Sequence, residues 1–577
     1  EQTMKLRQLS LTLSAALLSG LLAACGSAPE VERERISDAS AKRHQQTLNE
    51  AVESPVSPHS TQQDQAEMAA QTPARLSHTR QAYSMRKMAA LPSLHRPTAE
   101  VDRERYAELA ENGIHSVVDR PVSTFSVDVD SGAYALVRRF LNQGRMPPSD
   151  LVRAEELINY FNYHYAYPDS AEHPFSLTTE VGPTPWNKGT RLVHIGIQGN
   201  TTAADLRPAA NLVFLVDVSG SMSDQNKLPL LKTAFKLLLQ QLTAEDRVTL
   251  VVYAGASGVV LEPTAGDQRG KIVSALAQLE AGGSTHGSAG IQLAYEMAEQ
   301  ARIEGGINRV ILATDGDFNV GTVDHRRLVE MIEQQRQRGI SLTTLGFGQG
   351  NYNDHLMEQL ADKGNGNYAY IDNINEARKV LVEELSATLE TIAKDVKIEV
   401  EWNPARVAEY RLIGYENRLL AAEDFNNDKV DAGDIGAGHT VTALYEIALH
   451  ESDGQRLSPR RYHSAPIKSS DKEAELAFLR LRYKQPDQHR SQLITQPILL
   501  SNQAPLAATS EAYRFSAAVA GFAQLLRGGR YTEAFDFDDA VALANTARGE
   551  DRFGYRGEFV RLVRLAGSLA APLTLNE

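Results

Sequence analysis

Asp217, Ser219 and Ser221 are oxygen-bearing residues spaced two apart, and they directly follow the apolar run 212–216. On a tight loop, the two hydroxyl groups can turn toward one point while the carboxylate orients a bound water. Hard oxygen ligands of this kind suit Mg²⁺ or a similar divalent cation. These residues therefore predict one part of a metal site, whose remaining ligands have to come from elsewhere in the chain.

Two later segments offer further oxygen atoms. Thr285 lies in the glycine-rich stretch 282–287, and Asp315 comes shortly after the apolar run 310–313. An unbroken apolar run is typical of a strand buried on both faces of a parallel sheet, and open α/β sheets bind ligands beyond the carboxyl ends of such strands. If the two strands are neighbours, Asp217 and Asp315 flank the crevice where the winding of the sheet reverses.

In this order, the five residues resemble the metal-ion-dependent adhesion site of von Willebrand factor type A (VWA) domains, and the resemblance covers about 209–393. It implies that Mg²⁺, or Mn²⁺ or Ca²⁺ in its place, is bound by Asp217, Ser219, Ser221, Thr285 and Asp315. Two carboxylates balance the charge of the ion and the hydroxyls are neutral, so the ion still attracts one anionic oxygen. The implied partner is a protein that presents an Asp or Glu. The alternative, a simple helix cap at 217–221, does not explain Thr285 or Asp315.

Strands and helices alternate from 211 to 393, which predicts a doubly wound, mostly parallel α/β sheet. The expected helices include 227–242 after the first strand and 374–393 at the end of the domain. A short return strand is expected at one edge, at 259–261. This is the Rossmann-like fold that the VWA resemblance implies.

The stretches on either side of this domain predict antiparallel strands. Segments 175–181 and 190–197 look like strands without partners, whereas 394–500 predicts a β-sandwich, followed by helices from 510 onward. We expect the first pair of strands to join the sandwich, so that the VWA domain is inserted between its halves. The flanking parts resemble the N-terminal extension and the C-terminal domain of unknown function in bacterial VWA lipoproteins. The expected domains are a signal peptide (1–24), a disordered tether (25–98), an N-terminal α+β extension (99–205), the VWA domain (206–393) and a C-terminal β-sandwich with helices (394–577).

The beginning of the chain has the features of an export signal. Lys5 and Arg7 precede the apolar stretch 9–22, which is too short for a stable membrane span and leads into Ala24-Cys25-Gly26. This resembles a bacterial lipoprotein signal and implies that Cys25 is lipidated, which would tether the protein to a membrane without spanning it. With no Asp after Cys25, the resemblance implies the outer membrane, facing the periplasm. An ordinary signal peptide with an incidental cysteine is the alternative.

An acidic pair suggests a different function. Asp128 and Asp130 follow a predicted strand and resemble the Asp-x-Asp motif of haloacid-dehalogenase-like phosphatases, but a strand end and a helix cap explain both residues. We therefore predict no catalytic residue and no enzyme activity. A metal-dependent or Asp-x-Asp phosphatase-like hydrolase, and a structural scaffold of the cell envelope, remain the alternatives. The formal net charge of −14 argues against a nucleic-acid partner. In the N-terminal extension (99–205), helices are expected at 101–112, from about 131 to 142 and at 151–161.

Two further features are interpreted as structural. The acidic stretch 424–434 resembles a calcium loop, but Lys429 and Ile435 stand where the EF-hand pattern needs a glycine and a bidentate acid, so a polar surface turn is predicted. His194 is expected to be a sheet residue rather than a metal ligand.

Overall fold

The computed structural model describes residues 104–107, 109–169, 172–201, 207–283, 287–316, 325–350, 352–458, 474–500 and 505–571. All of them belong to one of the two units of the chain, 94–577. The expected signal peptide, Cys25 and the tether lie outside the described residues. Among the helices of the described part, none has the length and hydropathy needed to cross a membrane.

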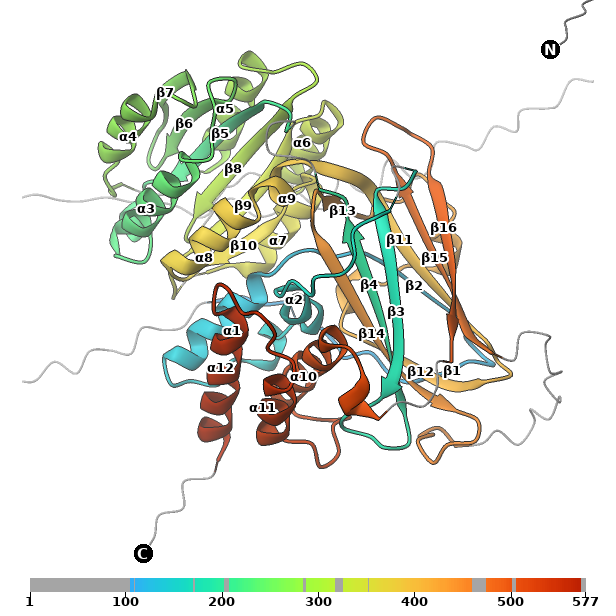
Figure 1. The fold of residues 1–577 in the computed structure, drawn as a ribbon. Helices are drawn as coiled ribbons and strands as arrows, with labels where there is room; N and C mark the ends of the chain where they lie inside the picture. The colour runs from blue at the N-terminus through green and yellow to red at the C-terminus, as the bar shows by residue number, and fades with distance from the viewer. Residues whose placement is uncertain are drawn as a thin grey trace, which may run out of the picture. The chain divides into compact units, whose positions relative to one another are not determined.

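A six-stranded sheet is the core of the central domain (Figure 1). Its strands are β5 (Ala210–Asp217), β6 (Arg247–Tyr253), β7 (Ser257–Ala265), β8 (Ile307–Thr314), β9 (Ser341–Phe347) and β10 (Tyr368–Ile371). The spatial order is β10-β9-β8-β5-β6-β7, and neighbours are parallel except β7, which is antiparallel to β6 at one edge. The predicted doubly wound sheet and its return strand are confirmed. The winding reverses between β5 and β8.

Helices cover both faces of this sheet because β5 is apolar on both sides. Val213 and Leu215 pack in one core with α5 (Gly287–Gln300), α6 (His325–Gln337) and α7 (Asp354–Lys363). Leu212 and Phe214 point to the opposite face and pack with α3 (Leu228–Leu238), α4 (Arg269–Ala277) and α8 (Ile374–Arg378). This alternation is the two-residue period of a strand buried on both faces.

The predicted helix 374–393 is interrupted, and it is wrong at its end, from 390 onward. Helix α8 is followed by a π-helical turn (Lys379–Glu383) and the short helix α9 (Leu385–Leu389), and strand β11 (Thr391–Trp402) then begins. Thr391 and Ala393 pair with Gly436 and Ile435, so a distant strand draws these residues out of the helix. Tertiary pairing overrides the local preference here.

Two further sheets form the predicted sandwich. One has the order β1 (His115–Ser116), β12 (Val407–Ile413), β14 (Thr440–Leu449), β4 (Arg191–Gly199) and β3 (Phe175–Pro183). The other has the order β13 (Gly433–Gly436), β11, β15 (Glu475–Lys484) and β16 (Gln492–Leu499), and β2 (Val122–Ser126) also pairs with β11. Because β4 pairs along its length with β14, the strands before the central domain join those after it, and the predicted insertion is confirmed.

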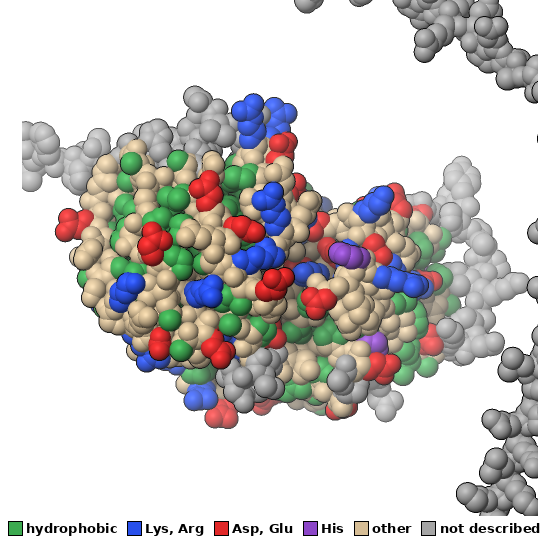
Figure 2. All heavy atoms as spheres, turned by 90° about the horizontal axis from the view of Figure 1, so that it is seen from above, with side chains coloured by type: hydrophobic (Ala, Val, Ile, Leu, Met, Phe, Trp, Pro, Cys, Tyr) green, Lys and Arg blue, Asp and Glu red, His purple; other side chains and the backbone are tan. Residues whose placement is uncertain are grey.

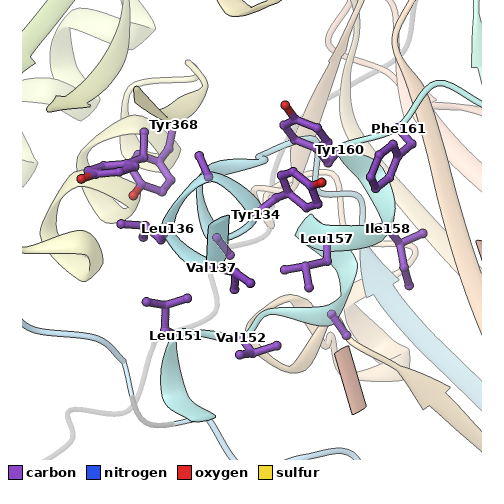
Figure 3. Close-up of a cluster of buried hydrophobic side chains, with 14 of the residues drawn as sticks. Tyr134, Leu136, Val137, Leu151, Val152, Leu157, Ile158, Tyr160, Phe161 and Tyr368 are labelled. Carbon is purple, nitrogen blue, oxygen red and sulfur yellow. The ribbon is translucent and has the colours of Figure 1, made fainter. Parts of the chain in front are cut away.

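The remaining helices are α1 (Gly132–Asn142), α2 (Ala154–Asn159), α10 (Glu511–Leu526), α11 (Phe537–Asn545) and α12 (Tyr555–Ala570). Tyr134 of α1 stacks on Tyr160, with ring centroids 3.8 Å apart, and Tyr368 of β10 belongs to the same buried cluster (Figure 3). The helix predicted at 101–112 is wrong, because the described residues there are not helical. The helix predicted at 151–161 is replaced by a 3-10 turn and α2, since Arg153 between them is extended.

Buried ion pairs also connect these parts. Arg138 of α1 is 1% exposed, and its guanidinium donates to Asp372 and Glu376 after β10 and, at 3.0 Å, to Glu558 of α12. A charge buried without partners would cost several kcal/mol. Through these ion pairs, Arg138 connects the N-terminal extension both to the central domain and to the last helix.

Lowering the pH from 7 to 5 is expected to reduce the free energy of unfolding by about 2 kcal/mol through His194. The hydroxyl of Tyr165 lies 2.6 Å from its Nε2, and burial lowers the pKa of His194 from 6.5 to about 3. Between these values the folded ring stays neutral while the unfolded chain takes up a proton. Stability is therefore lost as the pH falls below about 6.5.

Urea denaturation at the two pH values checks this expectation. His194→Gln should remove this share of the pH dependence, whereas His450→Gln, on an exposed turn, should retain it. Equal pH dependence of His194→Gln and the unsubstituted chain would contradict the expectation.

Candidate metal site

Asp217 is the last residue of β5 and is completely buried. Its Oδ1 accepts a hydrogen bond from the backbone N–H of Ser219 at 2.8 Å. Its Oδ2 accepts two more, from the Thr314 hydroxyl at 2.9 Å and from the Tyr253 hydroxyl at 3.1 Å. These donors come from β8 and β6, the two strands that flank β5, so the sheet itself holds the carboxylate in one orientation.

The two serines lie on the turn that follows. The Oγ atoms of Ser219 and Ser221 are 2.9 Å apart, close enough to share one ion or water. The glycine-rich loop is hydrogen-bonded to this turn, because Gly220 donates to the Gly283 carbonyl at 3.1 Å and Gly282 donates to Val218 at 2.8 Å. Thr285, two residues after Gly283, lies outside the described residues.

Asp315 follows β8 directly and is also completely buried. Since β8 pairs with β5, with Val216 opposite Ala313, the two carboxylates leave neighbouring strands at the same end of the sheet. Asp315 Oδ2 accepts a hydrogen bond from Lys227 Nζ at 3.0 Å. The structure thus brings four of the five predicted residues to one end of the sheet, at the reversal of winding.

The electrostatics of this end of the sheet favour a cation. Burial raises the pKa of Asp217, hydrogen bonds from Ser219 and Thr314 lower it, and the negative charge of Asp315 raises it. Two buried carboxylates and two adjacent hydroxyls are the donor set that a hard divalent ion prefers. A cation would offset the unfavourable proximity of the carboxylates, so the residues present fit a divalent metal.

Removal of the Tyr253 hydroxyl is expected to weaken Mg²⁺ binding by about 10-fold to 100-fold, because residues that orient metal ligands typically contribute that much. Tyr253→Phe deletes one donor to Asp217 Oδ2 and leaves the aromatic ring in place. Isothermal titration with MgCl₂ measures the change. Tyr295→Phe is the matched control, since Tyr295 is buried in the same domain and its hydroxyl has no hydrogen-bond partner among the described residues. Equal affinities for both variants would refute the role of Tyr253.

Sequence reasoning did not identify Tyr253, Thr314 or Lys227. Tyr253 and Thr314 end apolar strands with a hydroxyl, and this signal could have placed both beside Asp217 once the strand order was known. Lys227 had no such signal. It was expected to be the first residue of the helix 227–242, and only the path of the loop after Ser221 places it beside Asp315.

The acidic pair Asp128 and Asp130 lies elsewhere and is bound by an arginine. Arg418 donates to Asp128 at 3.0 Å and to Asp130 at 3.5 Å. Carboxylate oxygens of Asp128, Glu156 and Glu358 lie within 4.8 Å of one another, and burial raises the pKa of Glu358 to about 8. Asp128 and Asp130 are thus both held by Arg418, which favours the structural interpretation.

The stretch 424–434 also has internal partners. The Lys397 ammonium donates to the carbonyls of Asp424 and Asn427 at 3.0 and 2.7 Å, and Arg482 pairs with Asp428 at 3.1 Å. Basic side chains of the chain therefore bind these oxygens, as expected for a polar turn.

Family models match the central domain and the parts of the chain on either side of it. The model of the von Willebrand factor type A domain matches residues 211–384, a von Willebrand factor model matches 100–194, and the model described as "Uncharacterized protein YfbK, C-terminal" matches 387–569. Inter-alpha-trypsin inhibitor heavy chain H3 of Homo sapiens is 25% identical over 272 residues, which are 44% of this chain and 30% of that protein. A solved structure, von Willebrand factor type A from Catenulispora acidiphila, is 19% identical, covers 69% of this chain and 91% of its own, and has a TM-score of 0.37.

A further relative resembles most of the chain. The protein YfbK of Escherichia coli (strain K12) is 46% identical over 471 residues, which are 80% of this chain and 81% of YfbK. This match includes more residues than the VWA domain alone contains. The chain therefore belongs to the YfbK family of VWA-domain proteins.

Proposed function

We propose that the chain binds a protein partner through a divalent cation, with a carboxylate of the partner as the last ligand of that ion. VWA domains often mediate protein interactions and commonly bind a divalent metal. The observation that carries the proposal is the convergence of Asp217, Ser219 and Ser221 with Asp315 across β5 and β8. Thr285 belongs to the proposed ligands because its loop begins against the same turn.

In the proposed site, Asp217, Ser219, Ser221, Thr285 and Asp315 hold the ion, which is Mg²⁺ or, in its place, Mn²⁺ or Ca²⁺. When bound, the ion would supply an electrophilic centre for an anionic oxygen. The chain's own residues provide the preorganisation. Tyr253 and Thr314 hold the Asp217 carboxylate still, and the Gly220–Gly283 hydrogen bond fixes the serine turn against the glycine-rich loop.

The site is proposed for binding and not for catalysis. Hydrolysis would need a base within reach of a metal-bound water. Among the described residues, the groups placed around Asp217 are hydroxyls, the Asp315 carboxylate and a lysine ammonium already paired with Asp315. The net charge of −14 supports a protein rather than a nucleic acid as partner, and acidic and basic side chains are interspersed on the face in Figure 2.

Capture of partners by the immobilised chain tests the function. We expect proteins to be retained in Mg²⁺ and released by EDTA, and a peptide rich in Asp and Glu to compete with them. The matched control is Asp217→Asn on the same support. Retention that is unaffected by EDTA would instead support a structural scaffold.

We further propose that Cys25 carries acyl chains and anchors the protein to the outer membrane, facing the periplasm. The support is the basic and apolar segment that ends at this cysteine. Metabolic labelling with a palmitate analogue tests the anchor. Labelling that persists in Cys25→Ser would disprove it.

A further inference from the structure

Lys227 is a buried cation at the candidate metal site. Only 4% of the residue is exposed, and its Nζ lies 3.0 Å from Asp315 Oδ2. On the solvent side, the same atom is 4.0 Å from Asp224 Oδ2, whose side chain is 69% exposed. The ammonium therefore lies between a buried carboxylate of the site and an exposed carboxylate at its rim.

The surrounding chain holds this lysine in place. Its backbone N–H donates to the Asp224 carbonyl at 3.0 Å, and its carbonyl accepts the first hydrogen bond of α3 from Leu231 at 2.9 Å. Its aliphatic stem passes over Gly348, where φ is +78° and where a Cβ would collide with Cε of Lys227. A buried ammonium costs free energy unless it is paired, so Lys227 is built into the site with Asp315 as its partner.

Counting charges shows what this ammonium does. Asp217 and Asp315 contribute two negative charges and Lys227 one positive charge, so the buried part of the site carries a net charge of about −1 before a metal binds. Asp224 is not counted, because its side chain is 69% exposed and water screens its charge at 4.0 Å from the ammonium. A divalent cation changes this to about +1, whereas the same site without Lys227 would become neutral. With Lys227, one carboxylate from outside is needed to neutralise the loaded site.

We propose that Lys227 weakens the binding of the divalent cation and strengthens the binding of a carboxylate by the loaded site. This inference rests on the proposed metal site and specifies how that site selects an anionic ligand. Repulsion between the ammonium and the metal opposes loading. The same ammonium attracts the incoming carboxylate, and Asp224 offers the lysine a second anionic partner.

Titration of the full chain with MnCl₂, in chloride and then with added acetate, tests the inference. Lys227→Met keeps the length of the stem and removes the charge. We expect it to bind Mn²⁺ about 10-fold more tightly and to lose the gain in Mn²⁺ affinity that acetate produces in the unsubstituted chain. Lys227→Arg should behave like the unsubstituted chain, because it restores the charge.

Two more variants complete the test. Lys227→Gln is also neutral but can still donate to Asp315, so it replaces Lys227→Met if that variant does not fold. Lys232→Met is the control, since Lys232 is on the same helix and donates to the Ala277 carbonyl at 3.2 Å, away from the carboxylates. It should bind Mn²⁺ and respond to acetate like the unsubstituted chain.

Each outcome bears on the inference. Equal or weaker Mn²⁺ binding by the neutral variants would overturn it, as would an unchanged acetate effect. If only the neutral variants bind Mn²⁺, Lys227 excludes the metal: its effect on cation binding is then supported, whereas its role in carboxylate binding is overturned and the proposed function fails. If no variant binds Mn²⁺, both fail.

Discussion

Replacing Arg153 by Met is expected to lower the free energy of unfolding by about 3–5 kcal/mol, the cost of removing one partner from a buried ion pair. Arg153 is 1% exposed and lies just before α2. Its Nη1 and Nη2 donate to the two oxygens of Asp354 at 2.6 and 3.3 Å, and its Nε donates to Glu156. Without the guanidinium, two fully buried carboxylates would lose their counter-charge.

Because Arg153 connects two parts of the chain, its loss is expected to destabilise both of them. Asp354 begins α7 of the VWA domain, whereas Glu156 lies in α2 of the N-terminal extension. Urea denaturation followed by tryptophan fluorescence measures the loss. Arg302→Met is the matched control, because Arg302 is 37% exposed and pairs with Glu299 on the surface, where a pair contributes about 0–1 kcal/mol. A loss below about 1 kcal/mol for Arg153→Met would contradict the assignment.

Asp217→Asn is expected to lower Mg²⁺ affinity on the order of 100-fold or more, because it removes one of the two carboxylate charges and leaves the shape of the side chain. The amide oxygen can still accept from the Ser219 N–H, and the amide nitrogen can donate to the hydroxyl oxygens of Tyr253 and Thr314. The turn should therefore keep its geometry.

Without metal, Asp217→Asn should be at least as stable as the unsubstituted chain. Burial and the charge of Asp315 both disfavour ionised Asp217, so the neutral amide is expected to leave Tm in EDTA unchanged or to raise it. Tm in EDTA and in Mg²⁺ is the measurement, with Asp267→Asn, at an exposed turn of the same domain, as the control. An Asp217→Asn chain that still gains stability from Mg²⁺ would show that the ion binds elsewhere.

The fold was largely predictable because its signals are local and repeated. Apolar runs of four or five residues that alternate with amphipathic segments identify strands buried on both faces, and β5, β6 and β8 follow that pattern. The missed elements are those where distant residues compete with local preference. At 391–393, pairing with β13 replaces the predicted helix by a strand. At Arg153, whose side chain pairs with two buried carboxylates, the backbone is extended between a 3-10 turn and α2.

The sequence by itself determined the residue types of the candidate metal site, because the first Asp of Asp-x-Ser-x-Ser and Asp315 each lie at the carboxyl end of a strand that can be read from its apolar run. The tertiary structure decided which groups accompany them. Strand order places Thr314 and Tyr253 on Asp217, and the path of one loop places the Lys227 ammonium on Asp315. These contacts join residues 36 to 97 positions apart. Such contacts depend on which strands are neighbours, and no local spacing encodes that choice.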